Sequence, residues 1–153
     1  MKSDKFYIRD GRAPIPVNES TSEIMSSIKD RNTKPELILR KPLWNNGVKG
    51  YRLHWKKLPG KPDIAFPGKK LAIFVNGCFW HRCPYCNPPV PKSNTDFWTT
   101  KFQKNIERDQ RKISQLKVAG WTSMIIWECQ LKSNCKEYME KIKMKIRSNR
   151  VTL

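Results

Sequence analysis

The sequence predicts an α/β fold in which a mixed central β-sheet is flanked by helices. Two buried-strand patterns joined by a tight turn lie in the middle of the chain, and a third apolar strand pattern follows a long helical segment. Helical periodicity on both sides of these strands is typical of a sheet covered by helices. The chain has 153 residues, which is the length of one domain. We expect residues 1–20 to form a flexible N-terminal arm and residues 21–153 to form a single domain.

Two helices are expected before the first strand. A short helix over 22–29 precedes a firmer one over 34–45. Thr33 is a suitable N-cap for the second helix, and Pro35 is tolerated in its first turn. Glu36 occupies the place of the acidic residue in a capping box.

The predicted strands follow. Residues 51–55 alternate in polarity, and residues 63–66 and 71–75 form a hairpin of buried strands around a Pro-Gly turn. Residues 77–93 contain Gly, Cys and Pro throughout and are predicted to be irregular.

The C-terminal part is expected to contribute two helices and one strand. A long helix is predicted over 95–119 and ends at Gly120. A buried strand over 121–127 and a basic amphipathic helix over 134–147 complete the expected order α, α, β, β, β, α, β, α.

The charge of the chain points to a polyanionic partner. It has 31 lysines and arginines against 13 acidic residues, a net charge of +18. Residues 1–36 have 7 basic and 6 acidic side chains, whereas residues 37–153 have 24 and 7. The basic surface therefore belongs to the body of the protein, as in nucleic-acid-binding domains.

Several classes of protein are excluded by the composition. No apolar run approaches the length of about 20 residues that a membrane-spanning helix needs. The many aromatic residues allow a buried core, which argues against full disorder. Residues 1–18 contain no apolar segment typical of a secretory signal, so we expect a cytoplasmic protein with reduced cysteines.

Four cysteines form a candidate zinc site. Their positions are Cys78, Cys83, Cys86 and Cys129. Four thiolates on tight turns suit tetrahedral Zn²⁺, which would stabilise a loop that has no core of its own. The alternative is a group of small buried thiols without metal, and His81 could compete as a ligand. Cys135 is left over and is expected on a helix face.

One carboxylate of the long helix shares the apolar stripe of that helix. The stripe consists of Phe102, Ile106, Ile113 and Leu116. Asp109 lies between the two isoleucines, where burial of an unpaired carboxylate is costly. His81 is the candidate partner, and such a pair would orient the imidazole as a general base. A structural salt bridge to an arginine is the alternative.

A neighbouring stripe of the same helix is polar and aromatic. It consists of Trp98, Lys101, Asn105 and Lys112. This mixture suits a surface that faces nucleic acid, and it equally suits an ordinary solvated face.

Two further acids are candidates for chemistry. Glu36 falls at helical spacing with two leucines and could face the interior, although its capping-box role explains it structurally. Asp63 follows Pro62 and opens the hairpin, similar to the metal-binding aspartate of PD-(D/E)xK nucleases. The second strand ends in Phe-Val-Asn-Gly, however, and lacks the acid-x-Lys pair of that motif.

Taken together, these residues resemble the very short patch repair endonucleases of bacteria, which belong to the PD-(D/E)xK superfamily. The resemblance runs from about Thr21 to Cys129. It is carried by the stretches LPGKPD (58–63), FVNGCFWH (74–81), DFW (96–98), KNIERD (104–109), GW (120–121) and IWEC (126–129).

The resemblance implies a restriction-endonuclease-like fold with structural Zn²⁺, catalytic Mg²⁺ and the nicking of one DNA strand at a T:G mismatch. Such a mismatch arises when 5-methylcytosine deaminates. Asp63 matches the Mg²⁺-binding aspartate, and Val75 would bind the metal through its carbonyl. His81 matches the general base, Asp109 its partner, and Glu36 the acid from the N-terminal helix.

The resemblance also implies DNA contacts. Phe79, Trp80 and Trp98 match an aromatic wedge in the base stack, and Met25 matches a residue that intercalates from the opposite groove. Lys101 and Asn105 match residues that touch the mismatched pair. Lys61 and Lys112 complete the expected DNA-binding set.

The sequence departs from the family at three places. Val75 replaces a threonine, which is harmless if the carbonyl is the ligand. Asn76 replaces a histidine in the catalytic set, which bears on how protons are moved. The zinc loop has cysteines where histidines are common.

The expected function is therefore Mg²⁺-dependent nicking of duplex DNA at T:G mismatches by a monomer, in the bacterial cytoplasm and at the nucleoid when bound. Two alternatives stay open: a restriction-type nuclease that needs no mismatch, and a zinc-containing DNA-binding module without catalysis. Mismatch-repair proteins and a cytosine-5 methyltransferase are the expected associated proteins.

Overall fold

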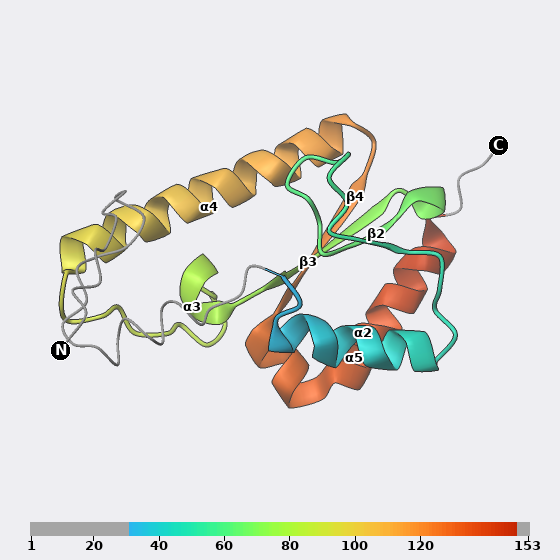
Figure 1. The fold of residues 1–153 in the computed structure, drawn as a ribbon, viewed down its shortest axis with the longest axis horizontal. Coiled ribbons are helices and arrows are strands. Elements are labelled where there is room, and N and C mark those ends of the chain that lie inside the picture. Colours follow the sequence, from blue (N-terminus) through green and yellow to red (C-terminus); the bar gives the residue numbers. More distant parts are fainter. Residues whose placement is uncertain (1–30, 150–153) are drawn as a thin grey trace, which may run out of the picture.

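The computed structural model describes residues 31–149, so the predicted arm, the helix over 22–29 and Met25 lie outside the described part. The elements are α2 (Lys34–Asn45), β1 (Arg52–Leu53), β2 (Ile64–Phe66), the 3-10 turn η1 (Pro67–Lys69), β3 (Leu71–Asn76), α3 (Cys78–His81), α4 (Thr95–Val118), β4 (Thr122–Trp127) and α5 (Glu128–Ser148). Figure 1 shows α4 on one side of the sheet and α2 with α5 on the other.

The four strands form one mixed sheet in the order β1-β2-β3-β4. β1, β2 and β3 pair antiparallel, and β3 pairs parallel with β4. The mixed sheet flanked by helices that the sequence predicts is therefore confirmed.

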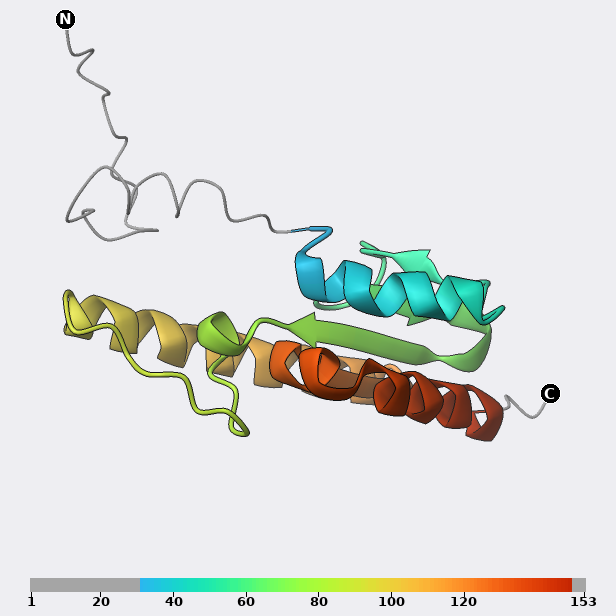
Figure 2. The ribbon, with the colours of Figure 1, turned by 90° about the horizontal axis from the view of Figure 1, so that it is seen from below.

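β3 is the centre of the molecule, and all six of its residues are buried. Ile73 and Val75 face a core shared with leucines of α2 and the apolar face of α5. Phe74 faces the other side of the sheet, where it packs with Leu116 of α4. Figure 2 shows α2 and α5 alongside β3, whose carboxyl end points toward α3.

Four predicted elements differ from the structure, the fourth being the last helix. The strand over 121–127 was expected to be buried, but β4 pairs only with β3 within residues 31–149 and Ile125 is 38% exposed. It is an edge strand, and only its Ile126 is buried. The irregular loop contains the single helical turn α3, and β1 is shorter than its alternating pattern.

The last helix begins six residues earlier than predicted. Gln130 accepts a hydrogen bond from the amide of Trp127 (3.0 Å), which starts α5 directly after β4. The helix is kinked at Asn134, whose side chain accepts a hydrogen bond from the amide of Glu137 at 3.2 Å. The predicted start at 134 therefore marks the cap of the second helical segment. Between residues 31 and 149 no helix is long and apolar enough to cross a membrane.

Candidate active site

The candidate catalytic residues gather in one cleft of about 880 Å³ at the carboxyl end of β3. Its polar lining includes Glu36, Asp63, Asn76, His81 and Asp109. These residues come from α2, the start of β2, the end of β3, α3 and α4. The sheet end therefore brings together side chains that are up to 73 positions apart in the sequence.

Asp63 lies directly against the end of β3. Its Oδ2 accepts a hydrogen bond from the backbone amide of Val75 at 2.7 Å. Burial raises the pKa of this carboxyl from 3.8 to about 6; the Val75 hydrogen bond opposes the rise, and the charge of Glu36 adds to it. The Val75 amide thus holds the Asp63 carboxylate in one position. The surroundings stabilise its ionised form less than water does.

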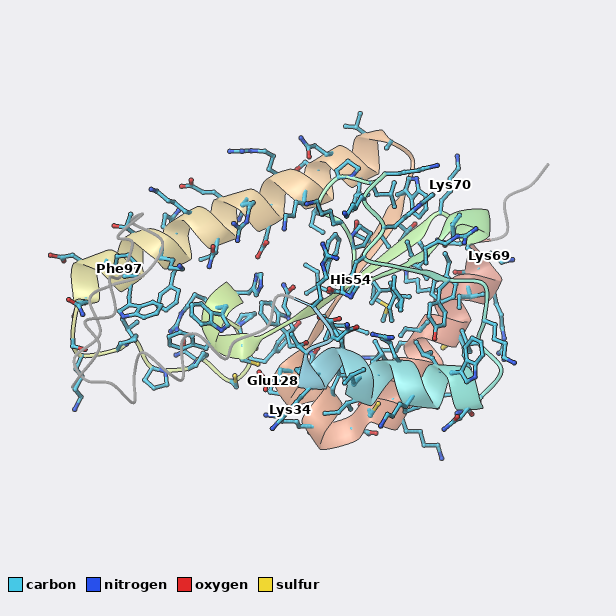
Figure 3. The ribbon with its side chains drawn as sticks, in the orientation of Figure 1. Lys34, His54, Lys69, Lys70, Phe97 and Glu128 are labelled. Carbon is cyan, nitrogen blue, oxygen red and sulfur yellow. The ribbon has the colours of Figure 1, made fainter. Side chains whose placement is uncertain are left out.

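His54 is a site residue that the sequence reasoning missed. Its Nε2 lies 3.2 Å from Glu36 Oε2, and its Nδ1 lies 3.7 Å from Asp63 Oδ1. Figure 3 labels His54 between α2 and α4. No local pattern marks it, because only the pairing of β1 with β2 places this histidine beside Asp63.

Glu36 connects the start of α2 with the cleft. Its side chain is 3% exposed and accepts hydrogen bonds from the amide of Asn32 and the hydroxyl of Thr33, both at 3.1 Å. Thr33 makes no side-chain hydrogen bond to the helix backbone, so the predicted capping box is not formed as expected. The Glu36 carboxylate instead links residues 32 and 33 to the first turn of α2, and it also faces His54.

His81 and Asp109 form a short hydrogen-bonded pair. His81 Nδ1 and Asp109 Oδ2 are 2.5 Å apart, so the partner of this acid is the histidine and not an arginine. Burial would raise the pKa of Asp109, but the hydrogen bond and charge of His81 outweigh it and hold the pKa below its usual value. Lys112 Nζ lies 3.8 Å from the other carboxylate oxygen. The acid is therefore ionised and fixes the imidazole from one side.

The four cysteines converge beside this cleft. One ligand atom of each of Cys78, Cys83, Cys86 and Cys129 lies within 4.8 Å of the others. The parallel register opposes Asn76 to Trp127, so the chain reaches Cys78 and Cys129 two residues beyond the same sheet edge. Cys83 Sγ and Cys129 Sγ are 3.7 Å apart. Two sulfur ligands at about 2.3 Å in a tetrahedron are about 3.8 Å apart, so the donor set fits Zn²⁺.

The remaining candidates for the cysteine cluster lie outside it. His81 is engaged with Asp109 and does not compete as a ligand. Cys135 is on α5, as expected, with its Sγ 3.5 Å from the carbonyl of Ile38.

Aromatic rings form a packed cluster between α3 and the start of α4. Phe79 is the hub, with ring centroids 5.1 Å from Trp80, 5.4 Å from Trp98 and 5.3 Å from Phe102. Trp98 is only 7% exposed, whereas Phe79 and Trp80 are half-buried. Asn105 is 8% exposed and donates to the carbonyl of Trp80 at 3.0 Å. The helix stripe that contains Trp98 and Asn105 is therefore not an ordinary solvated face.

Cations surround the acids of the cleft. The basic residues of its lining are Arg31, Lys61, Lys101, Lys104, Arg108 and Lys112. Lys101 Nζ lies 5.8 Å from the ring centroid of Trp80, which places it over the aromatic cluster. Burial lowers the pKa of Lys112, and the charge of Asp109 opposes this shift. A cationic rim around a few buried or half-buried carboxylates suits an approaching polyanion.

Comparisons with known proteins point in one direction. The sequence profile of the family described as DNA mismatch endonuclease Vsr matches residues 16–87. A type II nicking enzyme of Xanthomonas oryzae is 43% identical over 108 residues, covering 71% of this chain and 79% of the relative. A type II nicking enzyme of Neisseria meningitidis is 38% identical over 128 residues, covering 82% and 91%. The DNA mismatch endonuclease Vsr of Escherichia coli is 39% identical over 120 residues, covering 78% and 76%.

Proposed function

Because the chain belongs to the DNA mismatch endonuclease Vsr family, we propose that it nicks one strand of duplex DNA at T:G mismatches. The hydrolysis would be Mg²⁺-dependent and would take place in the bacterial cytoplasm. The observation that carries the proposal is the His81–Asp109 pair, 2.5 Å apart, in the same cleft as the half-buried carboxylate of Asp63. A fixed imidazole and a metal-binding carboxylate are what phosphodiester hydrolysis requires.

His81 has the role of general base. With Asp109 ionised, Nδ1–H donates the hydrogen bond to its carboxylate, so Nε2 carries the lone pair and can take a proton from water. The ionised Asp109 then stabilises the imidazolium that forms. Asn76 and Glu36 line the same space and are assigned to polar support of the reacting groups.

Asp63 and the carbonyl of Val75 are assigned to Mg²⁺. When bound, the ion supplies positive charge against the scissile phosphate. The donors are oxygen atoms, which Mg²⁺ prefers, and the Val75 amide holds the carboxylate in one orientation at 2.7 Å.

The DNA contacts are divided between cations and rings. Lys61, Lys101 and Lys112 line the cleft and are assigned to the DNA. The half-buried Phe79 and Trp80 are assigned to the wedge, which would kink and unstack the mismatched site. Trp98 lies beneath them in the free protein, and Asn105 holds the backbone of Trp80, so both support the wedge from behind.

Nicking assays on matched duplexes test this proposal. The protein is incubated with a T:G duplex and its fully paired counterpart, each with and without Mg²⁺. We expect a single nick in the mismatched duplex only, with Mg²⁺ only, and a rate about 10²–10⁴-fold lower for His81→Ala. Equal cutting of both duplexes would instead identify a restriction-type nuclease. DNA binding without cleavage would identify a non-catalytic module.

A further inference from the structure

Three ligating side chains from three elements meet on the floor of the cleft. Glu36 comes from α2, His54 from the end of β1 and Asp63 from the start of β2. One ligand atom of each lies within 4.8 Å of the other two. The family resemblance assigns Asp63 and Glu36 but gives no role to His54.

The imidazole of His54 has no hydrogen bond at its inner nitrogen. Nε2 is buried and lies 3.2 Å from Glu36 Oε2, but the two atoms are not aligned as donor and acceptor. Leaving a buried nitrogen without a hydrogen-bond partner is energetically unfavourable. The imidazole also lies close to both carboxylates, with Nε2 3.2 Å from Glu36 Oε2 and Nδ1 3.7 Å from Asp63 Oδ1.

A divalent cation bound to His54 Nε2 would have Glu36 as a neighbouring ligand, and a ligand atom of Asp63 also lies within 4.8 Å. A six-coordinate ion with bonds of about 2.1 Å has neighbouring ligand atoms about 3.0 Å apart. The 3.2 Å between His54 Nε2 and Glu36 Oε2 is close to that separation.

We propose that His54 and Glu36 join Asp63 as ligands of the metal site assigned above, so that this site binds a divalent transition-metal ion of the Mn²⁺ type more tightly than it binds Mg²⁺, which it still accepts. Imidazole nitrogen adds affinity for transition ions but little for Mg²⁺, whereas two carboxylates suit Mn²⁺ as well as Mg²⁺. The inference deepens the proposed function and rests on it for the link to nicking, because the ion would occupy the catalytic cleft. Binding itself needs no DNA and is measured without it.

The alternative is that His54 is only a counterion for the two acids. In that case the imidazolium would repel a metal ion, and its removal would strengthen metal binding. The two ideas therefore predict opposite changes in affinity for one substitution.

The test is Mn²⁺ binding to the untagged, zinc-loaded protein, followed by electron paramagnetic resonance. The signal of free Mn²⁺ gives the concentration of unbound ion and hence the dissociation constant. Spin-echo modulation detects a ¹⁴N nucleus that is directly bound to the ion. The chain has two histidines, so His54→Gln and His81→Gln assign the nitrogen completely. We expect nitrogen modulation in the parent and in His81→Gln, its loss in His54→Gln, and at least about tenfold weaker binding in His54→Gln. Mg²⁺ should displace the Mn²⁺ only in large excess.

Circular dichroism confirms that each variant is folded before binding is compared, and His54→Ala provides a second variant. Unchanged or tighter Mn²⁺ binding by the His54 variants would overturn the site, as would modulation that disappears in His81→Gln instead. If His54-dependent Mn²⁺ binding is found but the protein does not nick, only the proposed function fails. If nicking is found without His54-dependent binding, only this site fails.

Discussion

Asp63→Asn should stabilise the protein in the absence of divalent cleft ions, although it removes a functional group. The pKa of Asp63 is about 6 in the folded protein against an ordinary value of 3.8. That difference corresponds to about 3 kcal/mol. Asparagine keeps an oxygen that can accept the Val75 amide, so the main change is the loss of an ionisable group.

The sign follows from proton binding. Between pH 4 and 6 the folded protein holds the Asp63 proton more tightly than the unfolded chain does, so the stability of the parent falls as the pH rises through this window. The asparagine side chain of Asp63→Asn cannot ionise. Its advantage over the parent should therefore grow by about 1.4 kcal/mol from pH 5 to pH 8, whatever constant offset the substitution introduces.

Urea unfolding of zinc-loaded protein at both pH values measures this change. Glu107→Gln, which alters an exposed carboxylate on α4, is the matched control and should follow the parent. Adding a cleft ion at 100 times its dissociation constant for the parent should stabilise the parent by about 2.7 kcal/mol and should stabilise Asp63→Asn by less. A stability difference between variant and parent that is the same at pH 5 and pH 8 would refute the burial argument.

Four further substitutions test other parts of the structure. Cys83→Ser should lower the melting temperature and the zinc content to below one ion per chain, while Cys135→Ser, outside the cluster, should change neither; a zinc-free parent of equal stability would contradict the site. Phe79→Ala should weaken T:G duplex binding in fluorescence anisotropy by about 1–3 kcal/mol with an unchanged salt dependence, unless the ring is only core packing. Asp109→Asn should lower single-turnover nicking at least about 100-fold without loss of DNA affinity, and undiminished nicking would exclude its role. Gly60→Ala should lower the melting temperature, because its Cβ would lie 2.7 Å from Lys112 Cδ at a φ of +78°; an unchanged value would show that the loop adapts.

The central part of the fold could be predicted because its signals are local. The buried hairpin follows from two short apolar runs around a Pro-Gly turn, and the helix at 95–119 has unambiguous periodicity. β4 was expected to be buried because Met-Ile-Ile-Trp is apolar, but sequence alone does not tell an edge strand from a central one. The early start of α5 depends on the Gln130 side chain bonding to Trp127, for which no simple pattern exists.

The candidate site could be predicted only in pieces. Asp109 stood out because a carboxylate on an apolar stripe requires a partner, and the structure supplies His81. His54 gave no such signal, because a histidine in an alternating strand is equally compatible with a solvated position. Its role in the site depends on the register of β1 against β2, which is a tertiary property. Trp98 and Asn105 were ambiguous for the same reason. Whether a polar stripe of a helix is buried or solvated depends on which other segments pack against it.

The topology explains why these pieces meet at one point. Successive residues of β3 face opposite sides of the sheet, so one strand end is bordered by α2 on one face and by α4 on the other. Glu36 lies in the first turn of α2 and Asp109 lies within α4, and both line the cleft that Asn76 also lines. The chain leaves β3 directly into α3, which adds His81, and the parallel partner β4 ends in the same place and adds Cys129. A zinc ion held by the cysteines would therefore fix the strand end and α3 relative to each other. Loss of that metal should disturb the orientation of His81 before it unfolds the sheet, because the core around β3 does not include the cysteine cluster.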